Sequence, residues 1–336
     1  MASRLEQILA HLGLSGLHPF FRKEKVDDSL LGGLTDSDLR EIGVVKLGDR
    51  KRLLAAFSNA ATPLAAPEFS PAPEPAPQPA PTAPRAAKEA KEEGGVADHP
   101  SRAALGHPFL NSLGMPFVPT TRSKTLFCIW QLRICDYAQY CSETGAAMPS
   151  ADYPQGADHP VVNVSWADAH LFCEWLTKRE IWLGLINSHY QYRFPKDEEW
   201  SAAVGLPYEH GINPRARSGV IEEFPWGPDF PPPHGAGNYH ARLAVDEFKE
   251  TSPVGSFAPN KFGIYDLGGN VWEWCVDEYE RGSSFRVLRG ASCFNDDPEF
   301  LRSSYRDKFQ PDKGRNNAGI RIVLAPQSVG DPWYKA

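Results

Sequence analysis

The chain has 336 residues, of which 41% are hydrophobic, so it is long enough to form the cores of two ordinary domains. Its formal net charge of −7 argues against a general nucleic-acid binder, which needs a basic face. No apolar run is long enough for a membrane-spanning helix. The first residues lack the apolar centre and cleavage site of a signal peptide. We therefore expect a cytoplasmic protein that binds neither nucleic acid nor membrane.

Residues 1–60 are predicted to form a small helical interaction domain. Ser3 and Glu6 make a capping box, and the run that starts at Thr35 caps a second helix, which Gly43 ends. A longer helix is predicted from residue 46 to residue 58. Apolar residues behind the first cap fall on one helical face: Leu5, Ile8, Leu9 and Leu12.

Residues 61–104 have a different composition, in which proline alternates with alanine and a few polar residues. Proline fixes φ and removes backbone donors, so this stretch is predicted to be a flexible linker resembling a polyproline-II spacer. A groove ligand is the alternative, because PxxP-like spacings occur. The alternating prolines are Pro73, Pro75, Pro77, Pro79, Pro81 and Pro84.

Residues 105–326 are predicted to form a second domain of mixed α and β structure, followed by a tail of residues 327–336. Strands are expected near residues 117–118 and 126–130. Helices are expected from 136 to 144, from a Ser165 cap to 178, and from near Pro195. The remainder is rich in Gly, Asn, Pro and Trp and indicates loops, which in a compact domain usually need ions or a function to fix them.

The sequence has six cysteines, and none forms a CxxC pair. Four lie in apolar stretches and are expected to be reduced, buried side chains. Cys293 is considered separately below.

Two runs, residues 31–44 and 47–54, resemble the sterile alpha motif. That family often self-associates head to tail, an acidic surface of one copy meeting a basic surface of the next. Opposite charge favours such pairing, although ordinary solvated faces are the alternative reading. The acidic candidates are Asp27, Asp28, Asp36, Asp38 and Glu41, and the basic candidates are Lys46, Arg50, Lys51 and Arg52.

Several segments of the second domain resemble the formylglycine-generating-enzyme, or sulfatase-modifying-factor, family. They include residues 162–169, 192–200, 259–274, 287–292 and 319–321. The resemblance implies a loop-rich fold related to C-type lectins. The predicted fold class is therefore α+β, with a five-helix sterile-alpha-motif-like domain before a lectin-like domain.

Asp266 and Glu273 are carboxylates on either side of a Gly-rich turn that can aim carbonyls at one point. Such hard oxygen ligands suit a structural Ca²⁺, although these residues could instead cap loops. The resemblance implies ligands at Asp266, the carbonyls of Gly269 and Val271, and Glu273. It implies a second calcium site at Asn238, the carbonyl of Tyr239, Asp246 and the carbonyl of Phe248.

Oxidases of this family use two cysteines that bind copper, because thiolates suit soft copper(I). The corresponding window, residues 292–302, contains Cys293 alone, and no second cysteine follows it. We therefore expect no copper site and assign no catalytic residues. Related iron enzymes take histidines from an extra helical domain, whereas the N-terminal region here has only His11 and His18.

Residues 292–322 also resemble the variable segment of proteins diversified by diversity-generating retroelements. Aromatic and sulfur side chains beside Asp and Asn in a loop suit a ligand-binding patch, although Phe300 or Phe309 could be buried instead. The candidate ligand-binding residues are Cys293, Phe294, Asn295, Asp296, Asp297, Phe300, Asp307 and Phe309.

The leading hypothesis is a non-catalytic protein that recognises a protein or small ligand through its C-terminal domain. The N-terminal domain would multimerise it or recruit a partner sterile alpha motif. The alternatives are an enzyme of altered chemistry on the same scaffold and a structural scaffold driven by the N-terminal domain.

Overall fold

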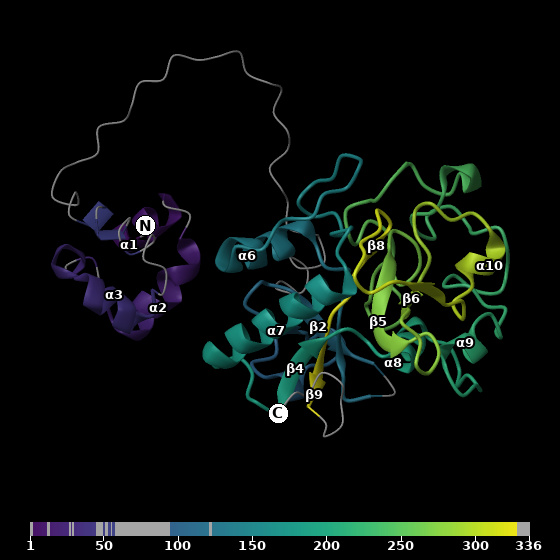
Figure 1. Cartoon of the computed structure of the whole chain (residues 1–336), viewed down its shortest axis with the longest axis horizontal. Coiled ribbons are helices and arrows are strands. Elements are labelled where there is room, and N and C mark those ends of the chain that lie inside the picture. Colours follow the sequence, from purple (N-terminus) through teal and green to yellow (C-terminus); the bar gives the residue numbers. More distant parts are fainter. Residues whose placement is uncertain are drawn as a thin grey trace, which may run out of the picture. The chain divides into compact units, whose positions relative to one another are not determined.

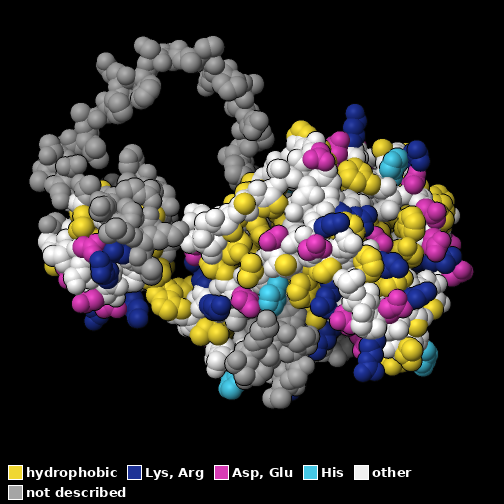
Figure 2. Space-filling model, in the orientation of Figure 1, with side chains coloured by type: hydrophobic (Ala, Val, Ile, Leu, Met, Phe, Trp, Pro, Cys, Tyr) yellow, Lys and Arg dark blue, Asp and Glu magenta, His cyan; other side chains and the backbone are white. Residues whose placement is uncertain are grey.

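The computed structural model describes residues 3–11, 14–26, 28, 30–44, 50, 53–54, 56–57, 95–120 and 123–327. The chain divides into two compact units, Met1–Pro77 and Gln78–Ala336 (Figures 1 and 2). The described part of the first unit is helical, and the second combines helices with two sheets. The predicted mixed α+β class is therefore confirmed.

The first unit packs short helices around one apolar cluster. Its helices are α1 (Arg4–His11), α2 (His18–Lys23) and α3 (Asp36–Ile42), with 3-10 turns η1 (Ser15–Leu17) and η2 (Leu31–Gly33). The buried cluster comprises Leu5, Leu9, Phe21, Leu31, Leu39, Ile42, Val44, Leu53 and Phe57. Leu12, most of the helix predicted for 46–58, and the linker up to residue 94 lie outside the described residues.

Both predicted helix caps are present. The backbone N–H of Ser3 donates to the Glu6 carboxylate at 2.8 Å, and the Glu6 N–H donates to the Ser3 hydroxyl at 3.1 Å. Thr35 and Asp38 form the same reciprocal pair at the start of α3. Gly43 ends α3 at a φ of 105°, a left-handed conformation that favours glycine.

The second unit contains two sheets (Figure 1). The five-stranded sheet is antiparallel in the order β1-β2-β3-β9-β4, with β1 Phe109–Leu110, β2 Pro116–Pro119, β3 Leu126–Cys128, β4 Tyr190–Arg193 and β9 Val323–Pro326. The four-stranded sheet has the order β7-β6-β5-β8, with β5 Trp272–Glu278, β6 Arg286–Arg289, β7 Asp307–Phe309 and β8 Ala318–Gly319. Strands β5 and β8 are parallel, and the other pairs are antiparallel.

The helices of the second unit are α6 (Ile134–Thr144), α7 (Trp166–Trp182), α8 (Asp197–Val204), α9 (Pro214–Arg217) and α10 (Pro298–Leu301), with a 3-10 turn η4 (Pro100–Arg102). Helix α7 packs against both α6 and β4. Its predicted cap is confirmed, because the Ser165 hydroxyl accepts the N–H of Asp168 at 3.0 Å. No helix in the described part of the chain is long and apolar enough to cross a membrane.

The predicted loop-rich region lies between α9 and β5. Across residues 218–271, the one helical or strand element is the 3-10 turn η5 (Ala241–Leu243). This segment holds Asn238, Asp246 and Asp266, three of the predicted calcium ligands. Irregular backbone of this length needs side chains or ions to fix it, so the candidate ligands lie where such fixing is needed.

The cysteines are all free thiols. Cys128, Cys173, Cys275 and Cys293 are buried, whereas Cys135 and Cys141 are half-buried. Four cysteines other than Cys293 were expected to be buried apolar side chains; three of them are buried, Cys128, Cys173 and Cys275, and Cys293 is buried as well.

Candidate functional site

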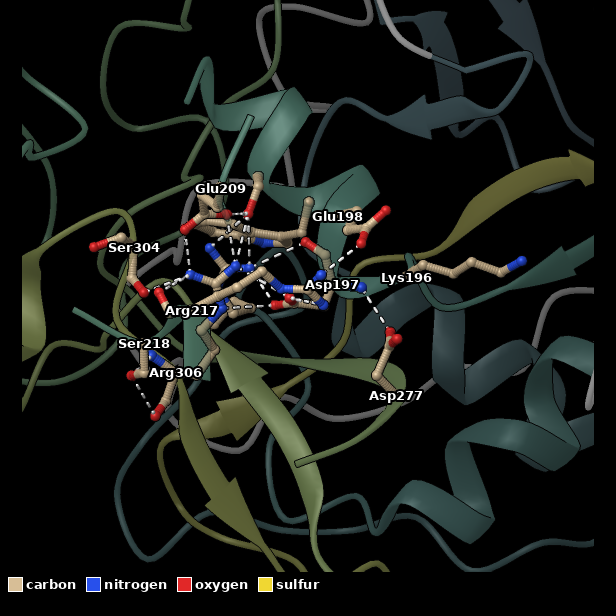
Figure 3. A network of polar contacts seen from close by, with 12 residues as sticks. Lys196, Asp197, Glu198, Glu209, Arg217, Ser218, Asp277, Ser304 and Arg306 are labelled. Atoms are coloured by element: carbon tan, nitrogen blue, oxygen red, sulfur yellow. Dashed lines mark hydrogen bonds and ion pairs between the residues drawn. The ribbon is translucent and has the colours of Figure 1, made fainter. Parts of the chain in front are cut away.

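A buried carboxylate, Asp197, lies at the start of α8 among three arginines (Figure 3). The Arg306 Nε lies 3.0 Å from Asp197 Oδ1, and the Arg217 Nη2 lies 3.1 Å from Oδ2. Arg289 pairs with the same carboxylate, and Glu209 accepts from Arg306. Burial would raise the pKa of Asp197, but the charges of Arg289 and Arg306 outweigh it and hold the pKa below its usual value.

This ion network fixes the backbone of residues 303–306. Arg289 donates to the carbonyls of Ser303 at 2.8 Å and Tyr305 at 3.2 Å. Arg306 donates to the carbonyl of Ser304 at 2.6 Å. Sequence reasoning assigned these arginines no such role. The available signal was that Arg289 is the one charged residue in the motif of residues 287–292.

The candidate ligand-binding segment begins with a buried thiol. Cys293 has no exposed surface, and burial raises its pKa to about 12. The prediction that Cys293 contributes to a ligand surface is therefore corrected. The next residue, Phe294, is 39% exposed and packs edge-on against Tyr153 at a ring separation of 5.9 Å. Asn295 is half-buried, and its Oδ1 accepts from the backbone N–H of Ser292.

The acidic residues of the segment have partners within the chain. Asp296 accepts from Arg242 at 3.1 Å, and Asp307 accepts from Arg315 at 2.7 Å. Asp297 is exposed and caps the short helix α10. Their carboxylates therefore shape the loop in addition to giving the surface negative charge.

Two half-buried phenylalanines pack on aromatic neighbours: Phe309 on a core tryptophan, and Phe300 on Tyr305. Phe300 meets the Tyr305 ring at 5.1 Å, and Tyr305 in turn lies 6.1 Å from Trp272. Phe309 lies 6.3 Å from Trp274. Both tryptophans belong to β5 and are buried. The segment thus places partly exposed aromatic rings over a rigid aromatic floor.

The first group of predicted calcium ligands, termed the β5 cluster, consists of Asp266, Gly269, Val271 and Glu273. All four direct an oxygen at the side-chain amide of Gln131. Gln131 Nε2 lies 3.2, 3.4 and 3.1 Å from the carbonyl oxygens of Asp266, Gly269 and Val271, and 3.1 Å from Glu273 Oε1. Gln131 Oε1 is buried and has no hydrogen-bond partner. The four residues that the sequence analysis grouped into one calcium site therefore do place oxygens around one point, the end of the Gln131 side chain.

The Asp266 carboxylate, expected from the sequence to be the ligand, bonds elsewhere. It accepts the N–H of Gly255 at 2.8 Å, and burial raises its pKa to about 6. The backbone carbonyl of Asp266, which sits at a φ of 55°, is the oxygen that faces Gln131.

Glu273 is held by two further donors. The Arg321 guanidinium donates to Glu273 Oε1 at 2.7 Å and also to the carbonyls of Cys128 and Tyr265. The Trp200 indole N–H donates to Glu273 Oε2 at 2.8 Å. Glu273 is 1% exposed, so its charge is balanced inside the protein.

The second group, termed the loop cluster, consists of Asn238, Tyr239, Asp246 and Phe248. The Asp246 carboxylate accepts the backbone N–H groups of Tyr239 at 3.0 Å and Phe248 at 2.8 Å. Asn238 is 1% exposed; its Nδ2 donates to the Glu250 carbonyl, whereas its Oδ1 has no partner. A buried amide oxygen without a donor is suited to a cation ligand.

Asn270 links the two clusters. Its backbone N–H donates to the Asn238 carbonyl at 2.8 Å, and its carbonyl accepts the Cys293 N–H at 2.9 Å. Asn270 lies between Gly269 and Val271 of the β5 cluster. One residue therefore contacts the loop cluster, the β5 cluster segment and the start of the candidate ligand-binding loop.

Carbonyl and amide oxygens dominate both clusters. Among the described residues, no three His, Cys, Asp or Glu side chains lie close enough to hold a metal ion together. Such a donor set suits a hard cation such as Ca²⁺ better than a soft or transition metal. In the loop cluster, the buried and unpartnered Asn238 Oδ1 fits such an ion.

The candidate self-association residues of the first unit differ in their exposure and in their hydrogen bonds within the domain. Arg50 is 4% exposed and donates to Asp36 at 2.7 Å and to the Val44 carbonyl at 3.0 Å. It is an internal residue, so its predicted place on an intermolecular basic surface is corrected. Asp28 accepts the backbone N–H groups of Arg4 and Leu5.

Asp38 belongs to the α3 capping box, and Glu41 is exposed. Asp27, Lys46, Lys51 and Arg52 lie outside the described residues.

Comparison with known protein families identifies both domains. The family model described as "Sulfatase-modifying factor enzyme 1-like domain" matches residues 115–326, and the SAM (sterile alpha motif) domain model matches residues 2–59. The chain belongs to the sulfatase-modifying factor family and carries an N-terminal SAM domain. The resemblance inferred from the sequence motifs is confirmed.

The relatives include proteins named as inactive and proteins named as enzymes. The chain is 33% identical over 189 residues to the Bos taurus "Inactive C-alpha-formylglycine-generating enzyme 2", covering 53% of this chain and 54% of that protein. It is 32% identical over 207 residues to the "Formylglycine-generating enzyme" of Thermomonospora curvata, covering 53% and 59%. The chain therefore spans little more than half the length of these relatives.

Among solved structures, "Treponema denticola variable protein 1" matches with a TM-score of 0.40 and 18% identity, covering 60% of this chain and 84% of that one.

Removing the central carboxylate of the ion network should strongly destabilise the second unit. Asp197→Ala leaves buried guanidinium groups without their shared counter-charge, and we expect the free energy of unfolding to fall by about 3–5 kcal/mol. All nine tryptophans lie in the second unit, so urea unfolding followed by tryptophan fluorescence reports on it. Asp98→Ala breaks an exposed pair with Arg102 and should change stability by less than about 1 kcal/mol. Equal effects of both variants would contradict a structural role for the network.

Asp277 should make stability depend on pH. Burial, and then the negative charge of Asp197, raise the pKa of Asp277 to about 6. A raised carboxyl pKa stabilises the folded state at low pH, and this contribution is lost as pH rises from about 4 to about 6. Asp277→Asn should therefore gain about 1–2 kcal/mol relative to the natural chain between pH 4 and pH 7. Unfolding curves at several pH values measure this difference, and a constant difference would refute the assignment.

Proposed function

We propose that this chain is a non-catalytic recognition protein built on the sulfatase-modifying factor scaffold. The principal support is the state of Cys293, the one cysteine in the window where family oxidases have two. Its thiol is buried and its pKa is raised to about 12, whereas a copper(I) ligand must be a thiolate. The neighbouring Phe294 is exposed instead. This combination favours binding over thiol oxidation.

The proposed recognition face consists of Phe294, Asp297, Phe300 and Phe309, with Tyr153 beside Phe294. Partly exposed aromatic rings with a carboxylate at the edge suit a ligand that has both apolar and basic groups, such as a segment of another protein. The C-type lectin-like fold that the family resemblance implies supports such a face near the C-terminus. Whether this segment is diversified stays a prediction that the coding DNA would test.

Calcium in the β5 cluster and the loop cluster is proposed to be structural. The loop cluster lies within the irregular segment between α9 and β5, and the β5 cluster lies at its end, where regular hydrogen-bonded structure is sparse. Ions there would rigidify loops that otherwise depend on a few side-chain bonds. Through Asn270 the same ions would support the backbone at Cys293.

The SAM domain is proposed to multimerise the protein or to recruit a partner SAM domain. The predicted flexible linker would let several recognition faces engage one target together. Such multivalency increases avidity without any new contact at the face, provided that the linker can span the separation of the sites.

A copper(I) titration tests the absence of oxidase chemistry. The natural chain and Cys293→Ser should show the same weak copper(I) binding in competition with a chelator, because a single buried thiol cannot form a two-thiolate site. A tight site that disappears in Cys293→Ser would overturn the proposal. The alternative function, an enzyme on the same scaffold, would then be favoured.

Selection from a displayed random peptide library tests the recognition face. Peptides selected on the natural chain should bind Phe294→Ser at least about tenfold more weakly, because an aromatic contact at the centre of the face is lost. Phe230→Ser is the matched control, because Phe230 is 43% exposed outside this face. Peptides that lose affinity equally for both variants, or for neither, would contradict the placement of the face.

A further inference from the structure

We propose that the recognition face binds the basic end of the chain's own proline-rich linker, residues 81–88, which occupies the face until a tighter ligand displaces it. This inference rests on the proposed recognition function. The segment reads Pro-Thr-Ala-Pro-Arg-Ala-Ala-Lys, lies outside the described residues and belongs with the face to the second unit. Its prolines match the aromatic rings of the face, and its positive charges match the carboxylates beside those rings.

The face presents two pairs of aromatic rings that meet at steep angles. The rings of Tyr153 and Phe294 lie 5.9 Å apart at an angle of 85°. Those of Phe300 and Tyr305 lie 5.1 Å apart at 62°. Each pair offers the flat face of one ring beside the edge of another, and surfaces lined with aromatic side chains in this way are the usual binding sites of proline-rich segments. Such segments are already extended and stiff, so they lose little conformational entropy on binding.

The spacing of the prolines suits two contacts made together. The polyproline-II helix has three residues per turn and a rise of about 3.1 Å, so residues three apart lie on one side, about 9 Å from each other. Pro81 and Pro84 have this separation. The carbonyls of such a helix have no internal donors, and the Tyr305 hydroxyl supplies one. Burial raises the pKa of Tyr305 to about 12, which keeps that proton in place.

Charge selects this part of the linker over the rest. Asp297 and Glu299 are exposed and lie between Phe294 and Phe300 in the chain. The segment 81–88 carries two basic residues and no acidic one, whereas residues 71–78 have a similar density of prolines but carry one acidic residue and no basic one. Exposed charge pairs contribute little energy, but they orient a ligand and disfavour the wrong one. The prolines therefore provide most of the affinity, and the charges provide the direction.

The chain that joins the segment to the domain is long enough for this contact. The described part of the second unit begins at Gly95, eleven positions after Pro84. An extended chain of that length spans up to about 36 Å, whereas a domain of about 230 residues has a radius of gyration of about 17 Å. Tethering also keeps the segment at an effective concentration of about 1 mM near the face, so even a weak contact is populated.

Anisotropy titrations of fluorescent synthetic peptides with the full chain test the proposal. The variant that combines Pro81→Ser, Pro84→Ser and Arg85→Ser, termed the open variant, has no competing linker. It should bind a peptide of residues 79–88 with a dissociation constant of about 0.1 mM. The natural chain should bind the same peptide about tenfold more weakly, because its tethered copy competes at about 1 mM.

Matched controls separate the rings from the charges. A peptide of residues 71–78 should bind the open variant at least about fivefold more weakly than the basic peptide. Adding Phe294→Ser to the open variant should weaken binding of the basic peptide about tenfold, whereas adding Phe230→Ser should not. Asp297→Asn with Glu299→Gln keeps an acceptor at the α10 cap and removes both charges, so binding should lose its dependence on salt. Near-ultraviolet circular dichroism verifies folding, and the salt response decides if Phe294→Ser does not fold.

Equal affinity of the natural chain and the open variant for the basic peptide would refute docking of the linker. Equal binding of the two peptides, or unchanged binding after Phe294→Ser, would do the same. A linker that docks on a second copy would stop competing as the chain is diluted, whereas docking within one chain is independent of dilution, so loss of competition on dilution also contradicts the proposal. Peptides selected from the library would still depend on Phe294 in each case, so failure here is distinguishable from failure of the recognition function.

Discussion

The second unit depends on the burial of one carboxylate, Glu273, in β5. A charge taken out of water is tolerated only when donors surround it, so its partners must occupy defined positions. Those partners come from distant parts of the chain: Gln131 after β3, Trp200 in α8 and Arg321 before β9. Satisfying Glu273 thereby fixes both sheets and α8 relative to one another. Glu273 is also a member of the β5 cluster, so the carbonyl oxygens of that cluster belong to the same set of contacts.

Trp200 connects this centre to the ion network around Asp197. Its indole N–H bonds to Glu273, and the Arg289 guanidinium lies 4.4 Å above its ring. Arg289 also pairs with Asp197 and donates to the backbone of residues 303–306. A cation over a buried indole is stabilised by the electrons of the ring. The turn before β5 and the backbone of residues 303–306 therefore share one buried tryptophan.

Local features were predictable from the sequence, and long-range contacts were not. The Ser3 and Ser165 caps follow from residue type and spacing over three positions, which is the range of an N-cap. Gln131 lies 142 positions before Glu273, and no periodicity relates a glutamine in an apolar stretch to an ion site that far away. The grouping of oxygens in the two clusters could be expected only because a family pattern supplied their positions.

The burial of two residues, Arg50 and Cys293, was not predicted, because their polar or reactive side chains suggested exposure. Arg50 was expected on a basic surface because it lies in a run of basic residues, yet it bonds to Asp36 and Val44 inside the domain. Cys293 was expected in a surface loop, yet the link between its N–H and Asn270 draws it inward. In both residues a tertiary hydrogen bond, rather than composition, determines which side faces water.

The position of Asn270 has a thermodynamic consequence. Because its backbone N–H bonds to Asn238 and its carbonyl to Cys293, the proposed ion site in the loop cluster and the proposed recognition loop share a hydrogen-bonded connection. Wherever calcium changes the affinity of that loop for a target, linkage requires the target to change calcium affinity by the same factor. A target would then act as a heterotropic effector of ion binding, and the concentration of free calcium would set the threshold at which the protein engages it.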